Sequence, residues 1–284
     1  MLLVTGITGH SGTHFLRELV SHKYPGAIRC VVRSHSNTSM LDNCGLKIEL
    51  VVGDLDDQDF LNGAMRDVTT VLHLAAIFFS RKVVKEAIDN NADRMILVHT
   101  TGIYSKFKSA SENYKNIESD IQRAMEASNL QTGLVYLRPT MIYGNVNDKN
   151  MIIFIKVVDR ISLFPVVDHG KGLLQAVNGK DLGKTYYQLL SKSEIMNGDY
   201  ILSDEKALIM LELFQAISRE LRKKTTYLSV PLVMGVLMAK ILKAVSLGTI
   251  NYVEKVQRMG ENRSLPHDAA ARDFGYSPCH SKPA

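Results

Sequence analysis

The sequence predicts an α/β fold, a doubly wound parallel sheet that carries a smaller C-terminal lobe. Up to about residue 140, short β-branched runs alternate with helical patterns, as they do where crossover helices join parallel strands. A glycine-rich turn directly follows the first of these runs. After Pro139 the connections lengthen and helical patterns dominate, which indicates the lobe. We therefore expect a first domain over 1–140 and, over 141–284, mainly a lobe that is integrated with it.

The individual elements follow from the alternation of strands and helices up to about residue 140 and from the helical patterns after Pro139. β-branched and aromatic residues favour strands, and right-handed crossovers place successive strands in one sheet. The expected strands are 2–5, 28–33, 46–52, 70–74, 94–99 and 133–138. The helical windows between them are 12–22, 57–65, 82–90 and 113–128, and those of the lobe are 151–161, 180–190, 207–221 and 232–245.

Composition excludes several classes of protein. With 284 residues and 45% apolar content, the chain is long enough to bury a full core. The formal charge is +5, but acidic residues are spread throughout and no run of five like charges occurs, so we expect no nucleic-acid partner. The three cysteines share no ligand spacing and leave an odd count, which predicts reduced thiols and no metal site.

The sequence also bears on location. The N-terminus enters the first strand without a basic leader or a long apolar stretch, so we expect a cytoplasmic protein. The apolar segment 231–248 is interrupted by Lys240 and Lys243 and falls short of the roughly 18 apolar residues of a membrane span. We expect an amphipathic helix packed on the protein, with contact to a membrane surface as the alternative and no integral membrane segment.

The turn after the first strand has the spacing of a dinucleotide site. Gly6, Gly9 and Gly12 stand three residues apart and open a helix. Glycine lets the backbone turn tightly and approach a pyrophosphate, whose charge then lies on free N–H groups at the helix N-terminus. Because the turn follows a strand and precedes a helix, we expect a dinucleotide there; packing alone is the other interpretation.

The second expected strand indicates which dinucleotide binds. An NAD site usually has a carboxylate at the end of that strand, whereas an NADP site has a basic residue for the 2′-phosphate. Here the strand ends in Arg33 followed by Ser34, without a carboxylate. We therefore expect NADP, with NAD as the alternative; a solvated arginine is the interpretation without function.

Four short motifs occur in order along the chain, each after an expected strand: GITGHSG at 6–12, VGDL at 52–55, HLAA at 73–76 and LRPTMIYG at 137–144. Together they resemble the short-chain dehydrogenase/reductase superfamily, and within it the extended and atypical branches of nucleotide-sugar epimerases, dehydratases and NmrA-like proteins. The resemblance extends weakly to 175–181, 197–203 and 274–276. It implies a Rossmann-type fold. It also implies cofactor contacts from Gly6, Thr8, Gly9, His10, Ser11, Gly12, Arg33, Ser34, Asp54, Leu55, Ala75, Ala76, Pro139 and Thr140.

The resemblance also implies a catalytic position. Reductases and epimerases of this superfamily use a Ser or Thr after the fifth strand and a Tyr-x-x-x-Lys on the next helix, where the lysine favours the phenolate. Thr100, with Thr101 as the alternative, would supply the hydroxyl, and Tyr114 the phenol. Glu118 stands in the place of the lysine.

This departure leaves the chemistry open. A carboxylate one helical turn from a phenol would raise the pKa of the phenol, and Lys115 points about 100° away from Tyr114. Activation would return if burial protonated Glu118, or if Lys106 or Lys108 reached the phenol. In a shifted register Tyr114 and Glu118 would instead be surface residues.

The substrate is expected at the carboxyl ends of the strands, facing the lobe. Candidate residues are Phe78, Met141, Tyr143 and Arg263, and beside them Phe79, Asn145, His169 and Gln175. For each, a place in the core or in a solvated loop is the other interpretation.

We expect an NAD(P)-binding reductase or epimerase/dehydratase that acts on a hydroxyl or carbonyl carbon of a small molecule, such as a nucleotide sugar. The alternative is an NmrA-like redox sensor without catalysis. The sequence leaves open whether the protein forms a homodimer.

Overall fold

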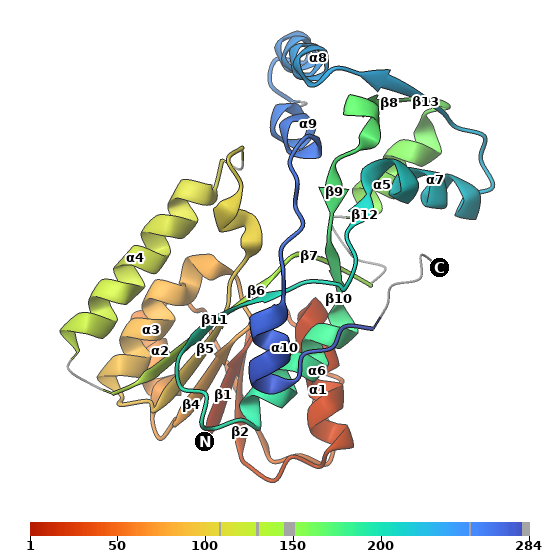
Figure 1. Cartoon of the computed structure of the whole chain (residues 1–284). Coiled ribbons are helices and arrows are strands. Elements are labelled where there is room, and N and C mark those ends of the chain that lie inside the picture. The colour runs from red at the N-terminus through yellow and green to blue at the C-terminus, as the bar shows by residue number, and fades with distance from the viewer. Residues whose placement is uncertain (108, 129–130, 145–150, 250, 280–284) are drawn as a thin grey trace.

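The structure, a computed structural model of the whole chain, describes residues 1–107, 109–128, 131–144, 151–249 and 251–279. Two regions are evident in Figure 1: a helix-covered sheet, and a lobe built from α5, α7, α8, α9 and the short strands around them. Asn145 and Lys108, which the sequence offered as site residues, lie outside the described residues.

The main sheet has seven parallel strands in the order β11-β6-β5-β4-β1-β2-β3. The chain moves outward from β1 to β3 and returns to the other side of β1 with β4, so the strand order switches direction between β1 and β4. The strands are β1 (Leu2–Thr5), β2 (Ile28–Val32), β3 (Ile48–Val52), β4 (Thr70–His73), β5 (Arg94–Val98), β6 (Gly133–Pro139) and β11 (Gly198–Leu202). The expected doubly wound sheet is thus confirmed.

Helices cover both faces of this sheet (Figure 1). On one face lie α1 (His10–Ser21), α6 (Gly179–Leu190) and α10 (Asp268–Phe274). The other face is covered by α2 (Gln58–Met65), α3 (Ser80–Asp89) and α4 (Ser111–Ala127). The fully buried Phe15 and Tyr186 meet edge-on where α1 packs against α6. Apolar residues at helical spacing form this contact, and their burial supplies most of its stability.

The second half of the chain contributes to the sheet as well as to the lobe. β11, α6 and α10 all come from beyond residue 141. Near the C-terminus, the hydroxyl of Tyr276 donates to the carbonyl oxygen of Ser203 at 2.8 Å, just after β11. Gly275 closes α10 with φ of 73°, a conformation that glycine adopts without strain.

The lobe is built around short strand pairs and a separate apolar cluster. Its strands are β7 (Met141–Tyr143), β8 (Leu163–Val167), β9 (Leu173–Leu174), β10 (Ala176–Asn178), β12 (Leu208–Ile209) and β13 (Thr226–Val230). Its helices are α5 (Met151–Arg160), α7 (Met210–Glu220), α8 (Leu232–Val245) and α9 (Val253–Met259). The 3-10 turns of the chain are η1 (Ile77–Phe79), η2 (Thr101–Tyr104) and η3 (Asp168–Gly170).

Helix α8 matches its predicted range but is not packed as expected. Of its side chains, Ala239 alone is buried, and most of its large apolar side chains are exposed. Among the described residues, no helix combines the length and the apolar character that crossing a membrane requires.

Candidate functional site

The glycine turn between β1 and α1 forms a close-packed cradle. Gly6 has φ of 76°, and a Cβ there would lie 2.8 Å from the backbone nitrogen of Ala75. A Cβ on Gly12 would lie 2.4 Å from the carbonyl oxygen of Gly6. Gly9 caps α1 without a side-chain hydrogen bond, so no cap side chain covers the first N–H groups of the helix. This cradle fits the pyrophosphate of a dinucleotide.

The ends of β2 and β3 lie next to each other. The backbone N–H of Gly53 donates to the carbonyl oxygen of Val32 at 3.0 Å. Arg33 is exposed, and its guanidinium forms no hydrogen bond or ion pair with any residue that the structure describes. The Asp54 carboxylate accepts from the backbone N–H of Asp56 at 3.0 Å, and the Asp54 carbonyl oxygen accepts from the backbone N–H of Asp57 at 3.1 Å. Arg33 is thus available to a ligand at this edge.

The remaining expected cofactor residues also follow neighbouring strands. Ala75 and Ala76 come after β4, whose His73 bonds through Nδ1 to the Thr5 hydroxyl at 2.7 Å. Thr140 comes after β6, and its backbone N–H donates to the carbonyl oxygen of Leu202 at 3.0 Å. All of these residues therefore gather at the carboxyl edge of one parallel sheet, as the strand order requires.

A cavity of about 810 Å³ lies between this edge and the lobe. At the sheet end its lining includes Thr100, Thr101, Tyr104 and Thr140. The remaining wall is mostly apolar, from α5, β8, α8 and α9. A cavity of this size and lining suits a small molecule with a large apolar part.

The two threonines differ in what their hydroxyls do. Thr101 Oγ1 donates to the carbonyl oxygen of Pro139 at 3.3 Å. Thr100 Oγ1 accepts from the backbone N–H of Gly102 at 3.0 Å, where it caps η2. Acceptance leaves the Thr100 proton available, and no described residue receives it. Thr100 can therefore donate a hydrogen bond into the cavity.

Tyr114 is buried and lies outside the cavity lining that the described residues form. Its ring packs against Phe78, with the ring centroids 5.8 Å apart, in the apolar cluster under α3 and α4. Burial raises the pKa of Tyr114; Arg258 opposes this effect and Glu254 adds to it. Both of these charges come from α9 of the lobe.

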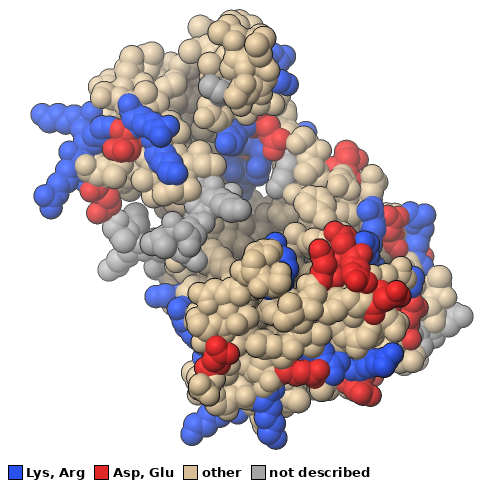
Figure 2. Space-filling model, turned by 180° about the vertical axis from the view of Figure 1, so that it is seen from behind, with Lys and Arg blue, Asp and Glu red and all other residues tan. Residues whose placement is uncertain are grey.

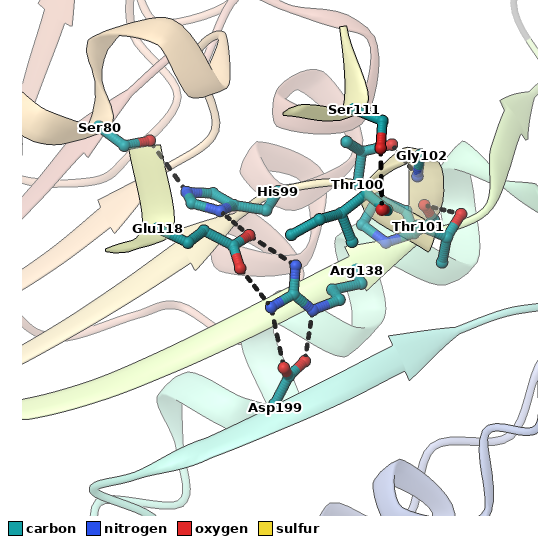
Figure 3. Close-up of polar contacts among 11 residues, drawn as sticks. Ser80, His99, Thr100, Thr101, Gly102, Ser111, Glu118, Arg138 and Asp199 are labelled. Atoms are coloured by element: carbon teal, nitrogen blue, oxygen red, sulfur yellow. Dashed lines mark hydrogen bonds and ion pairs between the residues drawn. The ribbon is translucent and has the colours of Figure 1, made fainter. Parts of the chain in front are cut away.

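Glu118 belongs to an ion-pair network in which Asp199 alone is exposed (Figure 3). His99 Nδ1 lies 2.8 Å from Glu118 Oε1, and Arg138 donates to both carboxylate oxygens at 2.6 and 2.8 Å. Arg138 also binds Asp199, and His99 Nε2 lies 3.0 Å from the hydroxyl of Ser80. The network thus joins α3 and α4 to β6, to β11 and to the residue that follows β5.

These contacts decide the ionisation of Glu118. Burial alone raises the pKa of Glu118, but the hydrogen bonds from His99 and Arg138 outweigh it and lower the pKa to about 2. The idea that burial protonates Glu118 is therefore wrong, because a buried arginine supplies the compensating charge. Lys106 is exposed, and its backbone N–H donates to Glu261.

The expected substrate residues divide into two groups. Met141, Gln175 and Arg263 line the cavity. Phe78, Phe79, Tyr143 and His169 do not appear in the lining that the described residues form. Phe78 instead packs on Tyr114, and the backbone N–H of His169 donates to the hydroxyl of Ser229 at 3.1 Å.

The lining also contains polar and charged residues that the sequence did not indicate, among them Tyr104, Lys255 and Arg258. Tyr104 ends η2, and the guanidinium carbon of Arg138 lies 5.7 Å from its ring centroid. Lys255 and Arg258 stand three residues apart on α9, a spacing that places two cations on one helix face. That spacing in the sequence could have indicated Lys255 and Arg258 as site residues.

Comparison with known proteins now gives the family. A family model described as NAD(P)H-binding matches residues 6–152, about half of the chain. The chain belongs to this NAD(P)H-binding family. The match includes the glycine cradle, both threonines and the Glu118 network except Asp199.

A curated relative of this NAD(P)H-binding protein is sterol demethylase protein B of Methylococcus capsulatus, 36% identical over 74 residues. That match covers 26% of this chain and only 21% of the length of the relative.

Solved structures are similar over nearly the whole chain. A triphenylmethane reductase of Citrobacter sp., complexed with NADP(H), has a TM-score of 0.72 and 18% identity, covering 99% of this chain and 97% of that one. A dTDP-glucose 4,6-dehydratase of Streptomyces venezuelae with NAD bound has a TM-score of 0.73 and 18% identity, covering 99% and 92%. The expected resemblance to epimerase/dehydratase and NmrA-like proteins is confirmed at the level of the fold.

Proposed function

We propose that the protein is an NADP(H)-dependent reductase that acts on a carbonyl group of a largely apolar molecule. The observation that carries this proposal is the cavity of about 810 Å³, which has hydroxyl groups at the sheet edge and mainly apolar walls beyond them. Similar folds include a reductase complexed with NADP(H), which supports the reaction class.

The glycine cradle would hold the cofactor pyrophosphate, and Arg33 would bind a 2′-phosphate. The chemistry that a bound NADPH supplies is hydride donation to the carbonyl carbon. Reduction to the alcohol also needs one proton on the carbonyl oxygen.

This chain offers two hydroxyl groups for that oxygen. Thr100 would orient it through its available proton. Burial raises the pKa of Tyr104, with an opposing effect from Arg138, so the Tyr104 phenol stays protonated at neutral pH and can donate. The apolar walls would exclude water from the reacting carbon.

The proposal is tested by following NADPH oxidation with a panel of apolar aldehydes, apolar ketones and nucleotide sugars that carry a keto group. We expect turnover with an apolar carbonyl compound and none with nucleotide sugars. Turnover with a nucleotide sugar alone would replace our substrate class, since Lys255, Arg258 and Arg263 in the wall could then bind its diphosphate.

A second candidate is a redox sensor that binds NADP(H) without catalysis. The specific observation in its favour is Glu118, which stands where the family lysine is expected and is fully engaged by His99 and Arg138. Calorimetric titration separates the two candidates. A sensor should bind NADPH and NADP with different affinities, yet transfer no hydride to any member of the panel.

A further inference from the structure

Helix α8 presents an apolar face that the other described residues do not cover. It lies at the end of the lobe away from the main sheet (Figure 1), and the corresponding end of the molecule is mostly uncharged in Figure 2. Val233, Leu237 and Ile241 are 79%, 56% and 55% exposed. They stand four residues apart, so they form one stripe along the helix.

The stripe continues on both sides. Met234, Met238 and Val245 widen it by helical spacing, and Leu247 extends it beyond the helix end, where it is 94% exposed. A cluster of large exposed apolar side chains on one helix marks an interaction surface, whereas single exposed ones are ordinary. This face of α8 is therefore suited to an apolar partner.

The charges on α8 indicate what kind of apolar partner this is. Lys240 and Lys243 are exposed and lie along one edge of the stripe, and the helix contains no acidic residue. Neither lysine forms an ion pair with any residue in the described part of the chain. An apolar stripe bordered by free lysines complements a bilayer with anionic headgroups.

We propose that α8 docks the protein on the surface of an anionic phospholipid bilayer, with its stripe among the acyl chains and its lysines at the headgroups. Because α8 is too short to cross a membrane, it would lie along the interface. A second copy of the chain fits less well, since a symmetric contact would bring like charges together.

The opposite side of α8 connects this surface with the cavity. Gly235 and Ala239 line the cavity, and Met238 and Leu242 both line it and are exposed. If the reductase proposal holds, an apolar substrate could pass from the bilayer along α8 into the cavity. The docking itself does not depend on that reaction.

The test is sedimentation with vesicles of phosphatidylcholine, either pure or mixed with phosphatidylglycerol. We expect the wild-type protein to bind the mixed vesicles more tightly. Replacing both lysines, Lys240→Gln with Lys243→Gln, should weaken binding to the mixed vesicles by roughly thirtyfold at low salt and leave binding to pure phosphatidylcholine nearly unchanged.

Leu237→Asp should weaken binding to both kinds of vesicle by about tenfold or more, because it places a charge in the stripe. Val20→Asp, at an exposed position on α1, is the matched control and should bind like the wild type. Thermal melting and NADPH binding, measured on every variant, establish that each is folded. Sedimentation, melting and NADPH binding are all measured without turnover, so failure of docking is distinguishable from failure of the reductase proposal.

The proposal is overturned if the wild-type protein stays in the supernatant with both kinds of vesicle, or if folded Leu237→Asp binds as well as the wild type. It is also overturned if light scattering shows a dimer that Leu237→Asp dissociates while vesicles capture neither protein. That result would assign the stripe to a second copy of the chain.

Discussion

Arg33 directly follows β2, with its guanidinium exposed and with no partner in the described part of the chain. If it binds the 2′-phosphate, Arg33→Ala removes a charge-assisted hydrogen bond of about 1.5–3 kcal/mol. We expect the NADPH affinity to fall by about 10- to 100-fold while the NADH affinity stays within about twofold. Fluorescence titration with both cofactors measures this. Arg66 is an exposed arginine before β4, at the amino edge of the sheet. The control Arg66→Ala should change neither affinity.

Thr100 and Tyr104 carry the proposed chemistry, whereas Tyr114 is buried and does not line the cavity that the described residues form. We expect Thr100→Val and Tyr104→Phe each to lower kcat by about 10²-fold, as the loss of one donor to a developing oxyanion does. Tyr114→Phe should lower kcat much less than either. Steady-state kinetics with the substrate found in the panel decides between them. If Tyr114→Phe alone caused a large loss of kcat, Tyr114 would be the proton donor, as the family pattern indicates.

At the scale of elements, the Glu118 network fastens α4 to the sheet. A depression of the Glu118 pKa from 4.5 to about 2 corresponds to about 3 kcal/mol of folding free energy, at roughly 1.4 kcal/mol per unit. Because the folded pKa is the lower one, this stability is fully present above about pH 4.5 and is lost as the pH falls towards 2.

Glu118→Gln should therefore lower the free energy of unfolding by about 3 kcal/mol near neutral pH, since Arg138 loses one of its two carboxylates. The difference from the wild type should shrink between pH 4.5 and 2. Urea unfolding over this pH range measures both effects. Glu112→Gln on the same helix, whose side chain is 78% exposed, should be nearly neutral. An equal loss at every pH would contradict the assignment of the effect to this ionisation.

The glycine cradle gives a second prediction at this scale. A Cβ on Gly12 would contact the Gly6 and Ile7 carbonyl oxygens at 2.4 and 2.6 Å, so the turn must shift. We expect Gly12→Ala to weaken dinucleotide binding by about tenfold or more, measured by titration, because the N–H groups of the turn no longer converge. Gly63→Ala is the control, since that Cβ would meet nothing within 4 Å. It should leave binding unchanged and stabilise α2 by up to about 1 kcal/mol.

The predictable elements are those whose patterns are local. The strands from β1 to β6 and the helices from α1 to α8 lie close to their expected ranges, because alternation and helical spacing are properties of each segment. The place of β11 beside β6 was not predicted. More than 50 residues, which include α6 as well as much of the lobe, separate the two strands, and no local pattern specifies a pairing at that distance. The exposure of α8 depends likewise on what the lobe leaves uncovered.

At the scale of the whole molecule, the cofactor side of the site was more predictable than the substrate side. The strand order brings Gly6, Arg33 and Ala75 to one edge, so a motif after each strand was enough. Arg258 and Tyr104 enter the cavity only because the lobe folds over that edge. The state of Glu118 depends on Arg138, a buried cation on a neighbouring strand, and no spacing along α4 reveals it.

We place the cofactor at the sheet edge and the substrate in the cavity. This separation can be tested at Ala239, which is buried in α8 and lines the cavity. Ala239→Phe places a ring in the space where the substrate would lie, while the cradle at β1 is part of the distant sheet. We expect the KM of the substrate to rise by about tenfold or more, equivalent to about 1.4 kcal/mol of binding, with the NADPH affinity unchanged. Ala244→Phe, at an exposed position of the same helix, should alter neither quantity. If Ala239→Phe weakened NADPH binding as strongly as substrate binding, the two ligands would share the lobe cavity, and the assignment of the cofactor to the sheet edge would fail.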